Sequence, residues 1–260
     1  MRSLKSTAKI FASGYLPVGL LLLLLIGWEI GVQVSNVKAW ILPGPIQVFR
    51  SLWEARELIW QHSLQTLYEA LWGFTIAILL GITIATLMDM SSYLRKAVYP
   101  LLVVSQTIPI IAIAPLFFIW FGYGITPKIV VVALVCFFPI TVNLVDGYRL
   151  VDQDMIRLLT SMGAGRGQIF RMVKLPAALP FFFSGLRIAG TYSIMGAVIG
   201  EWLGASKGLG ILMTRSSQSF LTDRVFATIF TISLLSLVIF GFIELLGRII
   251  MPWNQQRERS

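Results

Sequence analysis

Side chains with the chemistry for catalysis are few in this sequence, and none has a partner at a catalytic spacing. His62 is the only histidine, and neither a Gly-x-Ser-x-Gly turn nor a metal-ligand spacing accompanies it. Cys136 is the only cysteine and lies in an apolar run, which predicts a packing role and excludes a cysteine-based metal site. The sequence therefore predicts no catalytic residue and no bound metal or cofactor.

Residues 204–210 are rich in glycine and contain Lys207, so a phosphate-binding loop has to be considered. Such a loop needs the spacing Gly-x4-Gly-Lys-Ser/Thr between a strand and a helix, and this segment has neither the spacing nor that context. Since no other nucleotide motif is present, the chain is expected not to hydrolyse ATP. It needs a separate ATPase subunit if its work is driven by ATP.

A basic segment at residues 149–180 separates two long apolar runs and is the most informative part of the sequence. Each of its charged side chains would cost about 2.5 to 3.5 kcal/mol at the centre of a bilayer, so the segment must lie in water. Its apolar residues recur at i, i+3, i+4 and i+7, which predicts a short helix with one apolar face. These residues are Met155, Leu158, Leu159 and Met162.

Caps and helix breakers set the expected limits of this short helix. Asp152 or Asp154 supplies an acceptor for the first free N–H groups, and Gly163 ends the helix. A second helical stretch follows, and it is expected to stop at Leu175 and Pro176 because proline removes a backbone donor.

The composition of the chain is that of an integral membrane protein. Of its 260 residues, 57% are hydrophobic and 13% are charged, whereas soluble domains carry about 25% charged residues. The net charge of +9 is dispersed among loops and is not gathered into one stripe, so nucleic acid is not an expected partner. Membrane lipid is the expected surrounding.

Six apolar runs are long enough to cross a bilayer, since about 20 residues span its hydrocarbon core. All should be helices because unpaired backbone amides are costly in lipid, so we expect an all-α polytopic membrane protein. The first run is read as a retained anchor, because no small-residue cleavage site follows it. The runs are residues 15–34, 67–88, 97–121, 129–145, 181–203 and 225–250.

The distribution of Lys and Arg between the loops predicts the orientation. With a cytoplasmic N-terminus, 14 of the 21 basic residues face the cytoplasm and 7 face outward. The positive-inside rule therefore favours both termini in the cytoplasm. The same count places residues 149–180 inside, where ATP is available.

The spacing from Gly163 to Pro176 resembles a known motif. Nine residues separate Gly163 from an aliphatic residue, and any residue, Leu and Pro follow it, which gives Val173, Leu175 and Pro176. This pattern resembles the EAA loop in permease subunits of ABC importers. In that family the loop forms a coupling helix, which docks into a cleft on the cytoplasmic ATPase subunit.

One part of the motif departs from that family. Its Glu-Ala-Ala triplet would fall on Arg157, Leu158 and Leu159, so one expected polar contact with the ATPase is missing. The resemblance otherwise implies a set of ATPase-coupling residues. This set comprises Arg157, Leu158, Leu159, Met162, Gly163, Ala164, Val173, Leu175 and Pro176.

Further likenesses narrow the group. The Leu-Pro-x-Pro sequence at residues 42–45, with Gly73 and Phe74, resembles permeases of the nitrate, sulfonate and taurine group. The amino-acid sequences of the third and fourth runs resemble most those of the branch associated with pyrimidine precursors of thiamine. The resemblance covers most of the chain and implies a single permease domain, residues 1–260, of the type I importer kind.

That resemblance also implies partners and a location. Two permease copies, as a homodimer, would form the pathway, two ABC ATPase subunits would bind ATP beneath them, and an extracytoplasmic solute-binding protein would deliver the cargo. The cargo would be a small polar or anionic solute, such as a pyrimidine or thiamine precursor or a sulfonate. The expected location is the cytoplasmic (inner) membrane of a prokaryote. The alternative of an ion-coupled secondary transporter requires internal repeats and mid-membrane acids, and neither is evident.

Polar residues within the runs are candidates for the solute pathway, although each is equally able to satisfy a neighbouring helix. Pro109 and Pro115 predict a bend in the third run. A four-residue glycine spacing at Gly196, Gly200 and Gly204 allows close helix packing, within one subunit or across a dimer. Glu201 is either functional, or caps a helix, or is paired with Lys207 or Arg215. The pathway candidates are Ser105, Gln106, Thr107, Asn143, Tyr192, Ser193 and Glu201.

Overall fold

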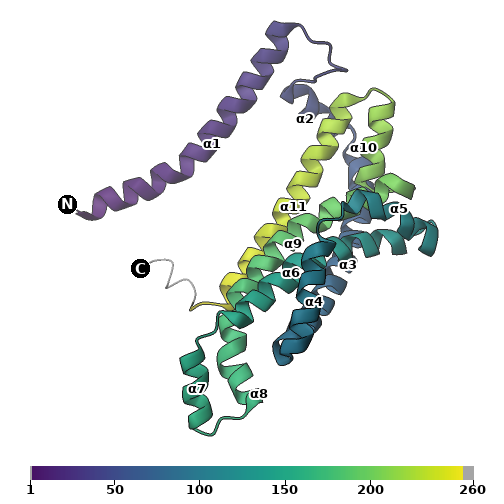
Figure 1. Cartoon of the computed structure of the whole chain (residues 1–260). Coiled ribbons are helices and arrows are strands. Elements are labelled where there is room, and N and C mark those ends of the chain that lie inside the picture. Colours follow the sequence, from purple (N-terminus) through teal and green to yellow (C-terminus); the bar gives the residue numbers. More distant parts are fainter. Residues whose placement is uncertain (1, 254–260) are drawn as a thin grey trace. The chain divides into compact units, whose positions relative to one another are not determined.

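The computed structural model describes residues 2–253, and the side chains of residues 16–253. Within that part of the chain all regular secondary structure is helical (Figure 1), which confirms the predicted all-α class. Contacts divide the chain into two units, residues 1–59 with 213–230 and residues 60–212 with 231–260. The terminal basic side chains counted on the cytoplasmic side, Arg2, Lys5, Lys9, Arg257 and Arg259, lie outside the described side chains.

The first unit holds the N-terminal helix α1 (Arg2–Ser35) and the short helix α2 (Pro45–Glu54). The first predicted span lies within α1, where residues 16–35 are apolar enough to cross a membrane. Glu29 of α1 accepts a hydrogen bond from Ile46 N at 3.2 Å, which satisfies a free donor in the first turn of α2. The ring of Phe49 packs against Phe230 at 5.6 Å between centroids.

The second unit is built around three long helices, α3 (Arg56–Met90), α6 (Thr126–Arg149) and α9 (Leu175–Gly204), with the later part of α11 (Thr222–Ile250). Helix α10 (Leu209–Gln218) follows α9 along the chain. The predicted spans 67–88, 129–145, 181–203 and 225–250 each lie inside one of these long helices. All four helices are long and apolar enough to cross a membrane.

The third predicted span is not one bent helix. It consists of α4 (Ser92–Ser105) and α5 (Ile110–Phe121), whose axes differ by 101° across a short break. Pro109 stands at the N-cap of α5, and a proline biases the residue before it toward extended backbone. Pro115 lies inside α5 and does not interrupt it. The two prolines therefore have different effects, and only Pro109 marks the break.

Helices α6 and α9 of the second unit pack closely against each other. A Cβ on Gly196 would lie 3.2 Å from Val132 Cα, and one on Gly200 would lie 3.2 Å from Lys128 Cα. Gly196 and Gly200 thus pack against α6, and Gly204 packs against Phe118 and Tyr123, so all three glycines pack within one subunit. Cys136 is buried in this contact and donates to Ala189 O at 3.2 Å, as expected for a packing residue.

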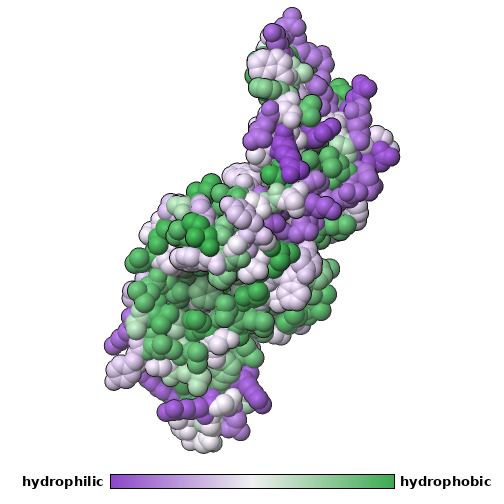
Figure 2. Space-filling model, turned by 90° about the vertical axis from the view of Figure 1, so that its right-hand side faces the viewer, coloured by the Kyte–Doolittle hydropathy of each residue, from purple (hydrophilic) through white to green (hydrophobic). Residues whose placement is uncertain are grey.

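Apolar side chains cover much of the face shown in Figure 2, and hydrophilic side chains gather at its lower end, where Figure 1 places α7 and α8. Several large apolar side chains on the long helices are exposed, among them Leu79, Leu237 and Phe242. A surface of this kind suits contact with lipid tails, because the hydrocarbon core removes the cost of apolar exposure.

Close packing of α6 on α9 generates a prediction about Gly185. A Cβ at this position would lie 2.6 Å from Pro139 O, a backbone atom that cannot turn aside. We expect Gly185→Ala to destabilise the protein by about 1–3 kcal/mol, measured as a lower melting temperature in detergent. Gly241→Ala is the matched control, since no atom lies within 4 Å of a Cβ there. Equal melting temperatures for the two variants would contradict this packing.

Candidate functional site

The segment that connects α6 to α9 folds as predicted at its first helix. Helix α7 (Gln153–Ser161) is capped by Asp152, whose Oδ1 accepts from Asp154 N at 2.8 Å. Gly163 follows with φ +85°, a conformation that favours glycine. Ala164 N then donates to Leu159 O at 3.0 Å and closes the helix. Figure 1 shows α7 and α8 (Arg166–Ile169) side by side beyond the ends of α6 and α9.

The predicted apolar face of α7 is uncovered. Met155, Leu158 and Met162 are 51%, 61% and 74% exposed, and Leu159 is half-buried. Arg157 on the same helix is exposed and pairs only with Asp154, at 3.3 Å. Large apolar side chains grouped on a short, charged segment are typical of a surface that another protein covers.

The second half of the connection differs from the prediction at Leu175 and Pro176. These residues do not stop a helix; they begin α9, directly after a π-turn (Phe170–Lys174). The wider π-turn accommodates a proline that cannot donate to the preceding turn. Val173 is buried in the fold, so it anchors the segment and has no free surface, whereas Leu175 remains exposed.

An ion pair fixes the second half of the connection, residues 166–174, to α3. Lys174 Nζ lies 2.9 Å from Asp89 Oδ1 and 2.8 Å from Asp89 Oδ2, and both side chains are largely buried. Tyr148 of α6 packs against Phe170 with ring centroids 5.7 Å apart. The sequence analysis missed this ion pair. Opposite charges at the ends of two spans were the only signal for it.

Three of the pathway candidates lie together at the break between α4 and α5. Ser105, Gln106 and Thr107 are exposed in succession. The hydroxyl of Ser105 donates to Leu102 O, and that of Thr107 donates to Val104 O, each at 2.8 Å. The break therefore presents a polar segment within an otherwise apolar pair of helices.

The other candidates do not join that polar segment in a single site. Asn143 donates to Pro139 O at 2.8 Å, and Ser193 is buried and donates to Gly190 O at 2.7 Å. Tyr192 is exposed on α9. Glu201 is fully buried and accepts from Thr66 Oγ1 at 2.6 Å and from Gly210 N at 2.5 Å. Of the alternatives from the sequence, this is capping of a helix start and not an ion pair with Lys207 or Arg215.

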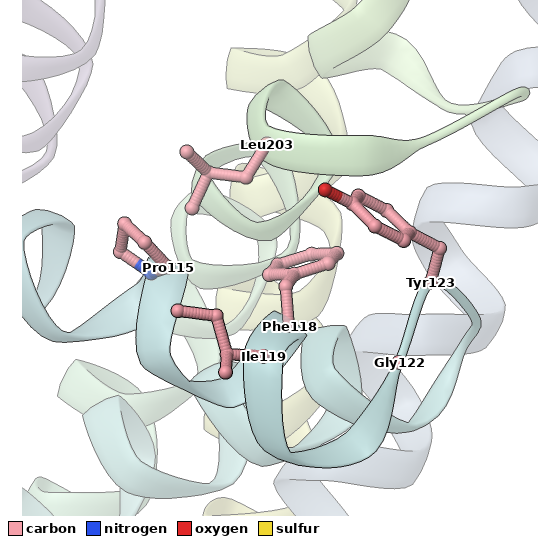
Figure 3. A pocket seen from close by; sticks show the side chains of 6 residues that line it. All are labelled: Pro115, Phe118, Ile119, Gly122, Tyr123 and Leu203. Atoms are coloured by element: carbon pink, nitrogen blue, oxygen red, sulfur yellow. The ribbon is translucent and has the colours of Figure 1, made fainter.

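A cavity of about 500 Å³ lies between α5 and the end of α9. The rings of Phe118 and Tyr123 are tilted against each other at 6.0 Å, and Figure 3 shows Leu203 opposite them. The Tyr123 hydroxyl is the only polar side-chain atom in the lining. Sequence reasoning did not identify this cavity, whose lining residues are Pro115, Phe118, Ile119, Gly122, Tyr123 and Leu203.

Comparison with known proteins places these features in a family. Residues 77–251 match the family described as "Binding-protein-dependent transport system inner membrane component". This match includes the whole connection between α6 and α9.

Three similar proteins cover nearly the whole chain. A formylaminopyrimidine transport permease protein of Halalkalibacterium halodurans is 41% identical, over 93% of this chain and 96% of its own. A riboflavin transport system permease protein of Chloroflexus aurantiacus is 38% identical, over 92% and 90%. A taurine transport system permease protein of Escherichia coli is 30% identical, over 92% and 90%.

Among solved structures, the MetNI methionine ABC transporter in an inward-facing conformation has a chain with a TM-score of 0.63 to this protein. It is 18% identical and covers 80% of this chain and 98% of its own. A chain of an amino acid ABC transporter has a TM-score of 0.62, with 19% identity over 78% and 97%. These likenesses concern the fold.

The Lys174–Asp89 pair generates a second prediction. Lys174→Met leaves the largely buried Asp89 carboxylate without its partner, so residues 166–174 should separate from α3 more often. We expect trypsin to cleave after Arg157 and Arg166 several-fold faster in this variant. The charge-reversed double variant Asp89→Lys with Lys174→Asp should recover most of the resistance. A cleavage rate equal to that of the unmodified protein would show that the pair does not hold the segment.

Proposed function

Because the chain belongs to the family of binding-protein-dependent transport system inner membrane components, we propose that α7 is the helix through which an ATPase subunit moves it. The chain is the transmembrane permease subunit of an ATP-driven ABC importer, with the fold of the type I importer permeases. It is not an enzyme, and ATP hydrolysis occurs on a separate ATPase subunit.

The uncovered apolar face of α7 supports this role. Met155, Leu158 and Met162 present a compact hydrophobic surface, whereas the segment around them is charged and suited to water. Arg157 occupies the position of the family's glutamate, and its exposed pair with Asp154 contributes little. We therefore expect the ATPase contact to depend mainly on apolar burial. Leu159, Gly163 and Ala164 set the shape of this surface.

The rest of the predicted coupling set connects α7 to the membrane helices. Val173 is buried, and Leu175 and Pro176 are already the first residues of α9. A displacement of α7 would thus be transmitted to α9 through residues 166–174, which are held in place by packing and by the Lys174 ion pair. This arrangement suits the transfer of movement from an ATPase to a spanning helix.

Both termini and the α7 segment lie on the cytoplasmic side of the inner membrane in this proposal. The excess of 14 basic residues over 7 supports that orientation. The opposite face then receives cargo from a solute-binding protein. Multi-pass membrane insertion itself follows from the family and from the apolar helices.

A second copy of the chain is the proposed partner within the membrane. The last residue of α4 and the non-helical residues that follow it expose polar side chains, Ser105, Gln106 and Thr107. Irregular backbone at membrane depth is tolerated where it is buried in protein or lines a water-filled path. A homodimer whose two breaks face a common path would meet this requirement. Asn143, Tyr192 and Ser193 would then support the path and not line it continuously.

The proposed cargo is a heteroaromatic precursor of the pyrimidine type. Identity to the formylaminopyrimidine permease is 41% and to the riboflavin permease 38%, against 30% for the taurine permease. The aromatic lining of the cavity at Phe118 and Tyr123 also suits a ring-shaped solute, because aromatic faces stack on one another.

Uptake of radiolabelled formylaminopyrimidine tests the cargo. Cells that produce the permease, its ATPase and its binding protein should accumulate the label, and unlabelled riboflavin or taurine should compete weakly. Cells without the ATPase serve as the control and should accumulate none. Efficient uptake of taurine, with no uptake of the pyrimidine, would overturn this choice of cargo.

Gly163 tests the coupling role. Valine at φ +85° is strained by about 1–2 kcal/mol or more, so Gly163→Val should change the exit of the chain from α7. We expect uptake to fall at least about tenfold while membrane insertion stays normal. Gly167→Val is the matched control, because no atom lies within 4 Å of its Cβ and its φ is not positive. Normal uptake by Gly163→Val would count against α7 as the coupling helix.

A further inference from the structure

Five buried polar side chains gather where α3, α6 and α9 meet the first turn of α10. They come from helices that are far apart in sequence, and none is more than 8% exposed. The coupling role of α7 does not use them. These residues are His62, Thr66 and Glu69 of α3, Lys128 of α6 and Glu201 of α9.

Three of these side chains bond to the backbone of three consecutive residues at the start of α10. His62 Nδ1 lies 2.7 Å from Gly208 O and 3.0 Å from Gly208 N, so it bonds to the Gly208 backbone as donor or acceptor according to its tautomer. Leu209 N donates to Thr66 Oγ1 at 2.8 Å. Gly210 N donates to Glu201 Oε2 at 2.5 Å. The first N–H groups of a helix have no acceptor within it, so α10 takes its caps from α3 and α9.

The capping groups are also joined to one another. Thr66 Oγ1 donates to Glu201 Oε1 at 2.6 Å, which links α3 directly to α9. Gly208 has φ +134° and leaves no room for a Cβ against the Glu201 carboxylate. The turn before α10 is therefore closed over Glu201.

An ion pair adds α6 to the same cluster. Lys128 Nζ lies 2.7 Å from Glu69 Oε1, which also accepts from Gln65 Nε2 at 2.7 Å. Lys128 is the residue on which Gly200 of α9 packs. All three long helices of the second unit are thus held at this level.

Polar contacts tie α3 to α9 at two widely separated levels. One is the Thr66–Glu201 bond and the other is the Asp89–Lys174 pair. The two levels lie 23 residues apart on α3 and 27 residues apart on α9, or about 35 to 40 Å of helix. This length is close to the thickness of a bilayer.

We propose that Glu201, Thr66 and His62 are positioning residues that lock the start of α10 to α3 and α9, so that the outer side of the permease follows α9 when α7 is displaced. This inference rests on the coupling role proposed for α7. Buried acids and a buried lysine are costly in a membrane domain, and apolar residues of equal volume would pack there at lower cost. Three directed bonds to one turn supply what apolar packing lacks, which is a fixed geometry.

Variants at Glu201 distinguish a role of these hydrogen bonds from a role in apolar packing. Glu201→Met keeps the volume but removes the carboxylate that accepts from Gly210 N and from Thr66 Oγ1, so uptake should fall about tenfold or more. Glu201→Gln keeps one acceptor for Gly210 N and a donor toward Thr66, so uptake should stay within about threefold of the unmodified protein. ATPase association and hydrolysis should persist in both variants, since α7 is untouched. Loss of association would instead point to the coupling helix.

Thr66→Val removes the hydroxyl that serves both Leu209 N and Glu201, and it should resemble Glu201→Met. Thr83→Val is the matched control on the same helix. The Thr83 hydroxyl is exposed and donates only to Leu79 O, at 2.7 Å. We expect normal uptake from this control variant.

Spin labels on cysteines at positions Leu64 and Lys207, in a Cys136→Ala background, measure whether the turn before α10 stays fixed to α3. In the assembled importer the distance between them should be narrow and equal with and without trapped nucleotide. In Glu201→Met the distance should broaden or change with nucleotide. Full uptake by Glu201→Met, or lost uptake with an unchanged narrow distance, would overturn the proposal. Failure of both Glu201→Met and Thr66→Val to assemble would also overturn it, since the cluster would then be a folding element.

Discussion

The close approach of α6 and α9 supports most of what this permease is able to do. Glycines on α9 bring its backbone against Val132 and Lys128 of α6, with no side chain between them. The α7 segment is suspended between these same two helices, since α6 ends at Arg149 and α9 begins at Leu175. A force on α7 is therefore applied to a closely packed pair of helices. Helices packed in this way move together more readily than they bend.

The need to satisfy backbone groups in lipid explains the exceptional parts of the fold. Where α10 begins, the buried side chains of Thr66 and Glu201 supply the acceptors. Where α4 ends, the break before Pro109 leaves the backbone exposed. The first solution gives a closed and rigid site, and the second gives an open one that needs water or a second subunit. The two regions thus suit different tasks, positioning and passage.

Local features of the fold were predictable from the sequence. Apolar run lengths gave the spans, and the spacing of Met155, Leu158 and Met162 gave α7 and its exposed face. Gly163 was identified as the end of α7 because few other residues adopt its conformation. These predictions needed only neighbouring residues.

Features that depend on contacts between distant residues were not predictable. Pro109 and Pro115 look alike in sequence, yet only Pro109 interrupts the helix. The partners of Glu201 lie 135 residues away at Thr66 and nine residues on at Gly210. Likewise, the pair of Asp89 with Lys174 and the cavity beside Phe118 exist only because α3, α5 and α9 fold together.

The most direct test of the central claim is crosslinking from a cysteine at Leu158 in a Cys136→Ala background. A short photoreactive crosslinker on this residue should capture the ATPase subunit in assembled membranes. An impermeant thiol reagent added outside intact cells should leave the cysteine unmodified. If the cysteine reacts from outside, or if the crosslinker never captures the ATPase, α7 is not the element through which ATP moves this permease.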